Sequence, residues 1–421
     1  MGEKYTKQTE NHLSGADCRT EGGVSVNFVF LSPYFPVNYY RFCVALKRAG
    51  ANVLAIGDLP YDQLRNELKD VLTEYYRVDD LHLFDQLRDA CGHFVRKYGP
   101  INGLESHNEY WMETDARLRS EFDIPGVRQS QIGLFKSKLR MKETFAEAGI
   151  AVAAGTSVFN QDQAEQFCAA HGYPVILKPD VGVGAVDTYR VDTAAELAAF
   201  FAVPRPQAYI IEQFIDGRIE TFDGLVDASG GIVFYTSHIY QYGIMEIIRD
   251  NLNAAFHSLR QLPDDLTEAG QRALAAFGLR ARFFHLEFFR RPDGSLIGLE
   301  ANMRPPGGPI LDMFNFANDF DIYQEWANMV VQGRFNKHLY NPQCRKYFCG
   351  FAGRKFNRSY ALSHEALLSR YGRFIAAHES LPPLYSTSMG DYFYLIRSED
   401  LSDVQEVTQA VSQTVADGQQ N

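Results

Sequence analysis

The sequence lacks three features that would each point to a particular class of protein. No apolar run approaches ~18 residues, so we expect no transmembrane helix. Six cysteines are scattered through 421 residues without a C-x-x-C pair. This spacing argues for reduced thiols in a cytoplasmic protein rather than for a disulfide framework or a zinc site. Residues 1–23 are polar and charged, which predicts a disordered tail and no signal peptide.

The sequence also has fewer basic than acidic residues. Lysine and arginine number 41 against 52 acidic residues, which gives a formal net charge of -11. Nucleic acids and anionic membrane surfaces attract net positive fields, so we expect neither as a partner. What is present is a globular composition, with 46% hydrophobic and 22% charged residues. At ~100–200 residues per domain, the length predicts two or three domains.

Strand and helix patterns alternate in residues 24–125. Apolar runs at 26–31 and 52–57 read as strands, with a helical pattern between them, and residues 99–104 enter a further strand. This alternation predicts a parallel sheet with helices on both faces. No G-x-G-x-x-G follows the first strand, so the domain is Rossmann-like in topology without the motif for binding a dinucleotide.

The rest of the chain predicts a mixture of helices and strands. A helical pattern covers 131–148 and ends at a glycine. The further expected elements are strands at 174–178 and 208–214, helices at 193–202 and 264–278, two strands around a turn at 227–231, two strands within 282–302, strands near 346–352 and 391–397, and a closing helix from about 402 to 415. No internal repeat or low-complexity tract is present, and the last ~110 residues carry no chemical motif.

The most informative pattern is a predicted hairpin with Asp293–Gly294 as its two-residue turn. That turn would place Glu287 opposite Glu300 and His285 opposite Asn302, with all four side chains on one face. Opposed carboxylates repel, and a bridging divalent cation would explain them, since Mg²⁺ prefers oxygen ligands. The alternative is a solvated face, and a bulge would break the register. His285 more often has a structural role, because Mg²⁺ favours oxygen.

Three further patterns are weak when taken singly. The apolar strand at 174–178 ends in Lys178 and leads into a loop with Gly182 and Gly184, whose N–H groups could cradle a phosphate. The strand ending in Glu212, Gln213 and Phe214 could offer an apolar slot and backbone hydrogen bonds to adenine, with Glu220 near the ribose. Lys138 lies on the helix at 131–148. For each of these the alternative is an ordinary solvated side chain.

Two loops are candidates for substrate selection. Residues 105–111, which include His107 and Glu109, follow a predicted parallel strand, and ligands bind open α/β sheets at the carboxyl ends of strands. The segment 238–243 also follows a strand and could line a pocket. A polar loop and packed tyrosines are the respective alternatives.

Taken in chain order, these motifs resemble the ATP-grasp superfamily. Over about residues 130–305 they form an ordered set: a lysine in a helix, an apolar strand ending in Lys-Pro, a glycine loop, E-Q-F-I-x-G-x-x-E, a glutamate on a strand, and E-x-N-x-R. The carboxylate–amine ligases and the biotin-carboxylase-like branch are the most similar. The sequence departs from biotin carboxylases at 305–309, which is rich in proline and glycine, and it has no biotinyl Ala-Met-Lys-Met segment.

The resemblance implies a role for each candidate residue. Lys138 and Lys178 would contact ATP phosphates, and the loop 181–185, with Gly182 and Gly184, would close over them. Glu212, Gln213 and Phe214 would line the adenine site, and Glu220 would bind the ribose. The implied Mg²⁺ ligands are Glu287, Glu300 and Asn302. Arg304 would hold the substrate carboxylate or an acyl phosphate, and with Lys178 it would be catalytic. Mn²⁺ could replace Mg²⁺.

The resemblance also implies an architecture and an activity. The expected fold is α/β, of the α+β ATP-grasp type: a Rossmann-like domain at 24–125, a two-lobed ATP-grasp domain at 126–335 with a lid at about 151–210, and an α+β extension at 336–421 that could complete the active site or form a homodimer interface. The expected enzyme joins a small carboxylate to an amine and releases ADP and phosphate. The alternatives are a kinase-like or biotin-carboxylase-like enzyme and a nucleotide-binding module without turnover.

Overall fold

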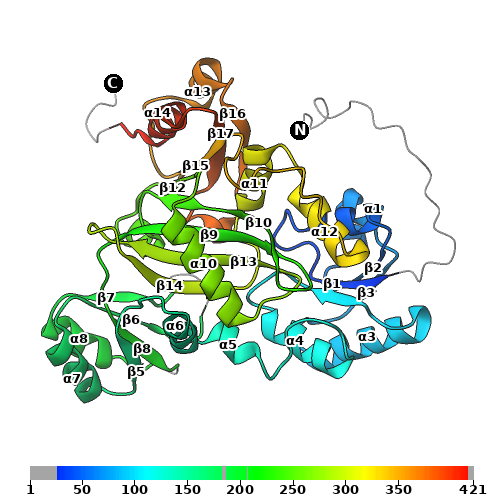
Figure 1. Cartoon of the computed structure of the whole chain (residues 1–421), viewed down its shortest axis with the longest axis horizontal. Helices are drawn as coiled ribbons and strands as arrows, with labels where there is room; N and C mark the ends of the chain where they lie inside the picture. The colour runs from blue at the N-terminus through cyan, green and yellow to red at the C-terminus, as the bar shows by residue number, and fades with distance from the viewer. Residues whose placement is uncertain (1–25, 183–185, 206, 416–421) are drawn as a thin grey trace.

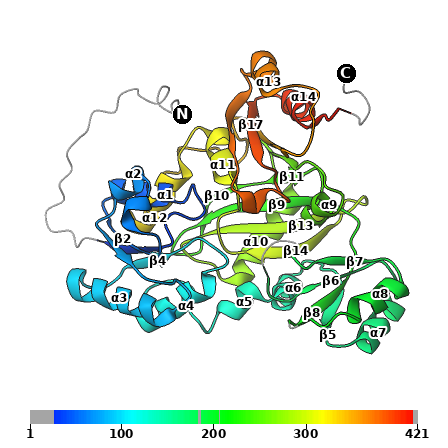
Figure 2. The same cartoon turned by 180° about the vertical axis from the view of Figure 1, so that it is seen from behind.

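The computed structural model describes residues 26–182, 186–205 and 207–415. The predicted tail at 1–23 and Gly184 of the glycine loop lie outside the described residues. Three sheets organise the chain, and Figure 1 shows two small sheets at opposite ends of a large central one. Figure 2 shows the same arrangement from behind.

The first sheet is parallel, in the order β3-β2-β1-β4, as the alternating pattern predicted. Its elements are β1 (Asn27–Leu31), α1 (Tyr40–Arg48), β2 (Asn52–Gly57), a 3-10 turn (Tyr61–Gln63), α2 (Asn66–Lys69), β3 (Glu74–Arg77), α3 (Phe84–Tyr98), β4 (Gly103–Glu105) and α4 (Met112–Glu121). Helices cover both faces, because Phe28 and Phe30 of β1 pack in the cluster that includes α1, and Val29 and Leu31 pack in the one that includes α3. The loop after β4 is thereby held at the carboxyl end of the sheet.

The second sheet is antiparallel, in the order β5-β8-β6-β7. Its elements are β5 (Gly155–Val158), α7 (Gln161–His171), β6 (Val175–Pro179), β7 (Tyr189–Val191), α8 (Ala194–Phe201) and β8 (Tyr209–Gln213). Leu177 and Ile211 pack in one cluster with residues of α7 and α8. Because strand side chains alternate, Lys178 and Glu212 point to the other face, away from these helices.

The central sheet has nine strands, in the order β14-β13-β9-β11-β12-β15-β17-β16, with β10 also paired to β9. They are β9 (Arg218–Val226), β10 (Ile232–Thr236), β11 (His238–Tyr240), β12 (Ala255–Ser258), β13 (Arg282–Arg290), β14 (Leu296–Asn302), β15 (Phe348–Arg354), β16 (Ile375–Ser380) and β17 (Tyr392–Ser398). The C-terminal strands therefore extend the sheet that carries the predicted hairpin, through pairing of β15 with β12. No local pattern in the sequence predicts that the C-terminal strands join this sheet.

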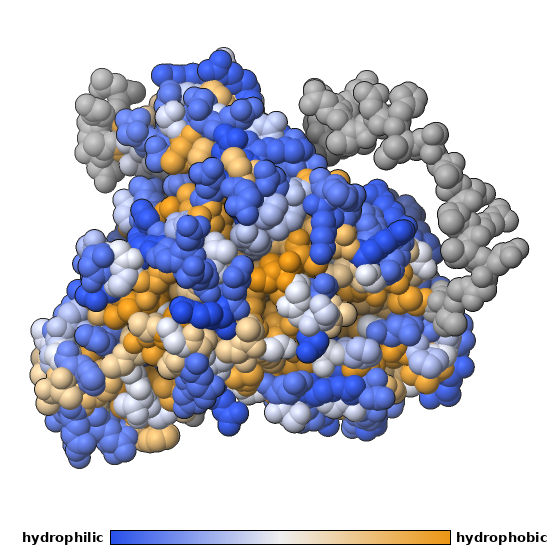
Figure 3. Space-filling model, in the orientation of Figure 1, coloured by the Kyte–Doolittle hydropathy of each residue, from blue (hydrophilic) through white to orange (hydrophobic). Residues whose placement is uncertain are grey.

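The two faces of the central sheet differ in what covers them. Cross-strand pairing puts Phe288, Glu220, Ile239, His257 and Gly350 on one face, which we call the outer face. This face is covered by α10 (Asp264–Phe277) at one end and by α14 (Leu401–Ser412) at the other. The opposite, inner face carries the predicted carboxylates. Figure 3 shows apolar residues gathered across the middle of the molecule and hydrophilic ones at its margins.

The remaining helices complete the packing around the sheet. They are α9 (Ile244–Arg249), α11 (Ile310–Asn318), α12 (Ile322–Gln332), α13 (His364–Tyr371) and a 3-10 turn (Pro383–Tyr385). Within the part of the chain that the structure describes, no helix has the length and apolar character needed to cross a membrane.

The predicted single helix at 131–148 is wrong, because the structure has two helices there. α5 (Ile132–Lys136) ends before Ser137, and α6 (Lys138–Glu147) begins after it. The Ser137 hydroxyl accepts a hydrogen bond from the Arg140 N–H as the N-cap of α6, and it donates one to Asp180. The break places Lys138 in the first turn of α6, next to the loop that follows β6.

Candidate active site

The β13–β14 hairpin brings the predicted carboxylates together. Glu287 pairs with Glu300, and His285 pairs with Asn302, as the sequence predicted. The turn itself was predicted wrongly. Arg291 donates its N–H to the Ser295 carbonyl, so three residues, 292–294, form the turn instead of two. A bulge next to Glu287 shifts the register back by one residue, and the two deviations cancel at the carboxylates.

The two opposed carboxylates have different electrostatic surroundings. Burial raises the pKa of Glu300, and the Glu287 charge adds to this effect, while Lys138 opposes it. Burial also acts on Glu287, but the His285 hydrogen bond and charge lower the pKa of that carboxyl. The two carboxylates therefore repel each other, and the neighbouring positive charges offset this repulsion only in part. A divalent cation between them would relieve that repulsion, so the donor set fits Mg²⁺.

Cation binding at this site would rest on few protein ligands. Among the described residues, no three acidic, histidine or cysteine side chains gather as metal ligands. The predicted set has two carboxylates and the buried Asn302 amide. Mg²⁺ commonly completes its octahedron with water and substrate phosphates, so such a partial set suits a nucleotide-bound cation.

His285 has a structural partner behind the carboxylates. Its Nδ1 lies 2.5 Å from Asp223, and its Nε2 lies 3.5 Å from Glu287. Burial disfavours the charged ring, yet the Asp223 charge and hydrogen bonds raise the pKa of His285 to about 10. Asp223 also bonds His238, at 2.7 Å. His285 therefore orients Glu287 from within a buried network, in keeping with its expected structural role.

Three lysines converge on the site from two elements. Lys138 lies 3.3 Å from Glu300 and donates to the Gly182 carbonyl at 3.1 Å. Lys178 lies 2.9 Å from Glu212, and Lys142 lies 3.2 Å from the same carboxylate. All three lysines are buried. The structure thus brings Lys138, Lys178 and the opposed carboxylates together, as the resemblance implied.

Lys142 is a site residue that the sequence reasoning missed. It lies one helical turn after Lys138 on α6, and this spacing of four residues was the available signal. Burial lowers the pKa of Lys142, whereas the Glu212 charge opposes this. For Lys178, the Glu212 and Glu300 charges outweigh burial and raise the pKa.

The residues predicted to contact adenine and ribose lie on different sides of the structure, and not all of them face the candidate site. The Glu212 carboxylate lies between the two lysines. The Gln213 and Phe214 N–H groups donate to the Ala154 and Pro174 carbonyls, so neither this side chain nor these two donors is free to face a base. Gln213 is exposed, and the Phe214 ring lies under the Arg190 guanidinium at 4.4 Å. Glu220 lies on the outer face, and its carboxylate is bound by Arg218 and Arg290. The structure therefore does not bring Glu220 together with the inner-face carboxylates.

Arg304 meets the loop that follows β4. Its Nε and one terminal nitrogen donate to a single Glu109 oxygen, at 3.1 and 2.7 Å. Tyr39 and Tyr385 lie close enough to interact electrostatically with the guanidinium. Burial opposes the charge of Arg304, while Glu109 raises its pKa. Of the loop 105–111, Glu109 thus faces the site, and its place beside Arg304 could not be read from the sequence.

The other two polar residues of this loop point into the protein. Glu105 binds Arg119 and Arg282, at 2.8 and 2.6 Å. His107 is 1% exposed among aromatic rings, and neither of its nitrogens has a hydrogen-bond partner within the described residues. The prospect that His107 contacts substrate is therefore wrong, because the side chain is packed in the core.

We expect His107→Phe to make the protein more resistant to acid. Burial lowers the pKa of His107 to about 3 from 6.5, so the unfolded chain binds the proton more tightly. Native stability should then fall by about 1.4 kcal/mol per pH unit on acidification from 6.5 towards 3, and the variant should lack this loss. Urea unfolding at pH 7, 6 and 5 measures the difference.

The comparison of the two proteins isolates His107, since Glu105 and Asp115 titrate in both. The advantage of the variant should grow as the pH falls. Parallel stability curves for the two proteins would show that His107 is not held neutral.

Parts of the chain are similar in sequence to known ATP-binding proteins and ligases. The family described as carbamoyl-phosphate synthase L chain, ATP binding domain, matches residues 137–235. An L-arginine-specific L-amino acid ligase of Bacillus subtilis is 26% identical over 269 residues, which are 61% of this chain and 64% of that protein. The chain spans less than two thirds of the length of the curated relatives it matches.

Solved structures share the fold at low sequence identity. An L-amino acid ligase from Bacillus licheniformis superposes with a TM-score of 0.72 at 13% identity, covering 93% of this chain and 99% of that one. The biotin carboxylase domain dimer of a Hydrogenobacter thermophilus 2-oxoglutarate carboxylase, in complex with MgADP, ADP and bicarbonate, gives a TM-score of 0.63 at 16% identity, covering 91% and 89%. The chain thus has the mixed α/β fold of the ATP-grasp ligase structures that it matches, and residues 137–235 match a family of ATP-binding domains.

Proposed function

We propose that this chain is an ATP-dependent ligase that activates a carboxylate as an acyl phosphate and joins it to an amine, releasing ADP and phosphate. The supporting observation is the meeting of opposed Glu287 and Glu300 with Lys138 and Lys178 on one inner face. The similarity to L-amino acid ligases favours an amino acid as one substrate.

The lysines would bind the phosphates of Mg·ATP, and the carboxylates would bind its cation. Lys138 and Lys178 would each place a positive charge near the phosphates, and residues 212–214 would line the adenine site. Glu287, Glu300 and Asn302 would hold Mg²⁺, with Mn²⁺ as a substitute. The bound cation offsets negative charge on the nucleotide phosphates. The ribose contact of Glu220 stays a prediction, without support from its outer-face position.

Arg304 and Glu109 would position the two reacting substrates. A guanidinium matches the geometry of a carboxylate or an acyl phosphate, and Arg304 is partly buried with its pKa raised by Glu109, so it keeps its charge. Glu109 beside it offers a carboxylate acceptor to the ammonium form of an amine. If the acyl phosphate and the amine are bound side by side, their reaction becomes effectively unimolecular, because both are already held in a reactive orientation.

The second sheet would act as the lid over this chemistry. Its inward face carries Lys178 and Glu212, so closure of about residues 151–210 would complete the phosphate site and exclude water. Exclusion of water matters because an acyl phosphate hydrolyses readily when water reaches it. A homodimer, with the C-terminal strands near the interface, stays a prediction.

The test is ADP release with Mg·ATP and pooled amino acids, with and without small carboxylic acids. We expect ADP formation that requires both an acid and an amine, and dividing the pools would identify the substrates. ADP formation without any amine, with a stable phosphorylated product, would replace the proposal by a kinase. ATP binding without release in any pool would replace it by a binding module.

A further inference from the structure

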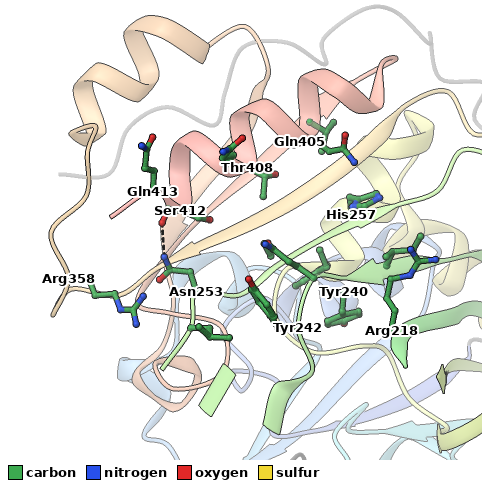
Figure 4. Close-up of a pocket in the computed structure, with 17 residues that line it drawn as sticks. Arg218, Tyr240, Tyr242, Asn253, His257, Arg358, Gln405, Thr408, Ser412 and Gln413 are labelled. Carbon is green, nitrogen blue, oxygen red and sulfur yellow. Dashed lines mark hydrogen bonds between the residues drawn. The ribbon is translucent and has the colours of Figure 1, made fainter. Parts of the chain in front are cut away.

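A cavity of about 680 Å³ lies apart from the candidate active site, between β11, β12 and α14. Figure 4 shows α14 along one side of it, with Thr408 and Ser412, and His257 of β12 on the side that faces this helix. Its volume is within the range of about 300–1,000 Å³ that small-molecule sites occupy.

The cavity opens on the outer face of the central sheet. Ile239 and His257, which line it, pair across the strands with Glu220 and Gly350 of that face. Strand side chains alternate between the faces, so Glu287 and the other proposed Mg²⁺ ligands point to the opposite side of the sheet. A ligand in this cavity would therefore be separated from the candidate active site by the thickness of the sheet.

The charge of the cavity differs from that of the chain. Two arginines line it, Arg218 and Arg358, and Figure 4 shows them at opposite ends. No aspartate or glutamate is among its described lining residues, although the chain carries a net charge of -11. Such a pocket attracts anions.

Both arginines retain hydrogen-bonding capacity. Arg218 donates to Glu220 through one terminal nitrogen, and Arg358 donates to the Asn251 carbonyl. A guanidinium has five N–H donors, so each can also bind a carboxylate or a phosphate group. Between them the lining is uncharged and mixed: apolar side chains such as Ile239, Leu252 and Val404 lie beside the amides of Gln241, Asn253, Gln405, Gln409 and Gln413. Burial lowers the pKa of His257 to about 4, which keeps this ring neutral.

We propose that this cavity is a second small-molecule site, for a compact organic anion with two separated anionic groups. Each anionic group would bind one arginine, and the amides and hydroxyls would bond the polar body between them. A free amino acid fits less well, because its ammonium group would find no carboxylate among the described lining residues. The anionic groups could be carboxylates or phosphates, since a guanidinium binds both.

Isothermal titration without nucleotide tests the site. The probes are glutarate, with two carboxylates, and 3-phosphoglycerate, with a carboxylate and a phosphate; dimethyl glutarate is the uncharged control. We expect at least one of these two anions to bind and the diester not to bind. Glutarate binding would identify a dicarboxylate site, and binding of 3-phosphoglycerate alone would identify a phosphate-recognising one. Binding of neither anion, or equal binding of the diester, would overturn the proposal.

Variants localise the binding. Arg218→Gln and Arg358→Gln should each weaken it about tenfold, the effect of losing one charge-assisted contact. Gln409→Glu, an exposed change on α14, should weaken it as well by adding a negative charge. Arg280→Gln is the matched control, because Arg280 is also a surface arginine that donates to a loop carbonyl outside the cavity. Unchanged affinity in all three cavity variants would overturn the assignment.

A final comparison separates this site from the proposed ligase site. The anion should bind Glu300→Gln as it binds the unaltered protein, and Mg·ATP should not displace it. Displacement by Mg·ATP would assign the binding to the nucleotide site instead. Because this assay needs no turnover, its result is independent of whether the chain is a ligase.

Discussion

Replacing Glu300 by Gln should lower the rate of ADP formation by about 10²- to 10³-fold, the effect of removing one group that stabilises transition-state charge. The substitution keeps the shape of the side chain but removes a carboxylate that faces Glu287 and lies 3.3 Å from Lys138. A cation bound there would lose one of two charged ligands. The measurement is ADP release at saturating Mg·ATP with the substrate pool that gives turnover.

The expected loss should not reflect unfolding. Burial and the Glu287 charge already raise the pKa of Glu300, so a neutral side chain is tolerated at this position. Urea denaturation should show the variant to be at least as stable as the unaltered protein without nucleotide. Glu268→Gln, on the exposed side of α10, makes the same chemical change away from the site and should leave the rate unchanged. Full activity in Glu300→Gln would refute the role of this residue in metal binding.

Glu212→Leu should destabilise the protein by about 3–5 kcal/mol, the usual cost of removing one partner from buried ion pairs. The Glu212 carboxylate is 4% exposed and lies within 3.2 Å of both Lys142 and Lys178. Without it, two buried ammonium groups would face each other with no neighbouring counter-charge from β8. Urea unfolding at pH 7 measures the loss.

A double variant separates charge from packing. Adding Lys142→Met to Glu212→Leu removes one of the unpaired ammonium groups, so it should recover part of the stability. Glu212→Gln, which keeps one oxygen that can accept a hydrogen bond from a lysine, should cost less than Glu212→Leu. A loss below about 1 kcal/mol in Glu212→Leu would mean that the two lysines are solvated rather than dependent on this carboxylate.

Local patterns in the sequence were sufficient for the most informative part of the site. Pairing of Glu287 with Glu300 depends on residues 13 apart in one hairpin, and the turn chemistry and strand periodicity both act at that range. The predicted two-residue turn was wrong, and a bulge restored the pairing. Bulges depend on packing against neighbouring strands, so the turn sequence alone could not reveal this one.

Face assignments outside the hairpin were less predictable. The resemblance to the ATP-grasp superfamily implies a ribose contact for Glu220, through its place after Glu212 in the motif. The register of β9 against β13 instead pairs it with Phe288 on the outer face, where Arg218 and Arg290 bind it. A shift of one residue moves every side chain to the other face, and only strand pairing sets that register.

The sequence by itself determined the alternation of elements, the ordered motifs and the hairpin carboxylates, because each rests on interactions between residues close in the chain. Tertiary structure alone decided that Glu109 meets Arg304, 195 residues away, and that β15 joins the sheet of β12. It also decided that two arginines from distant segments line one cavity. Such contacts follow from how the sheets and helices pack, and packing depends on the shapes of all the elements together rather than on any one stretch of sequence.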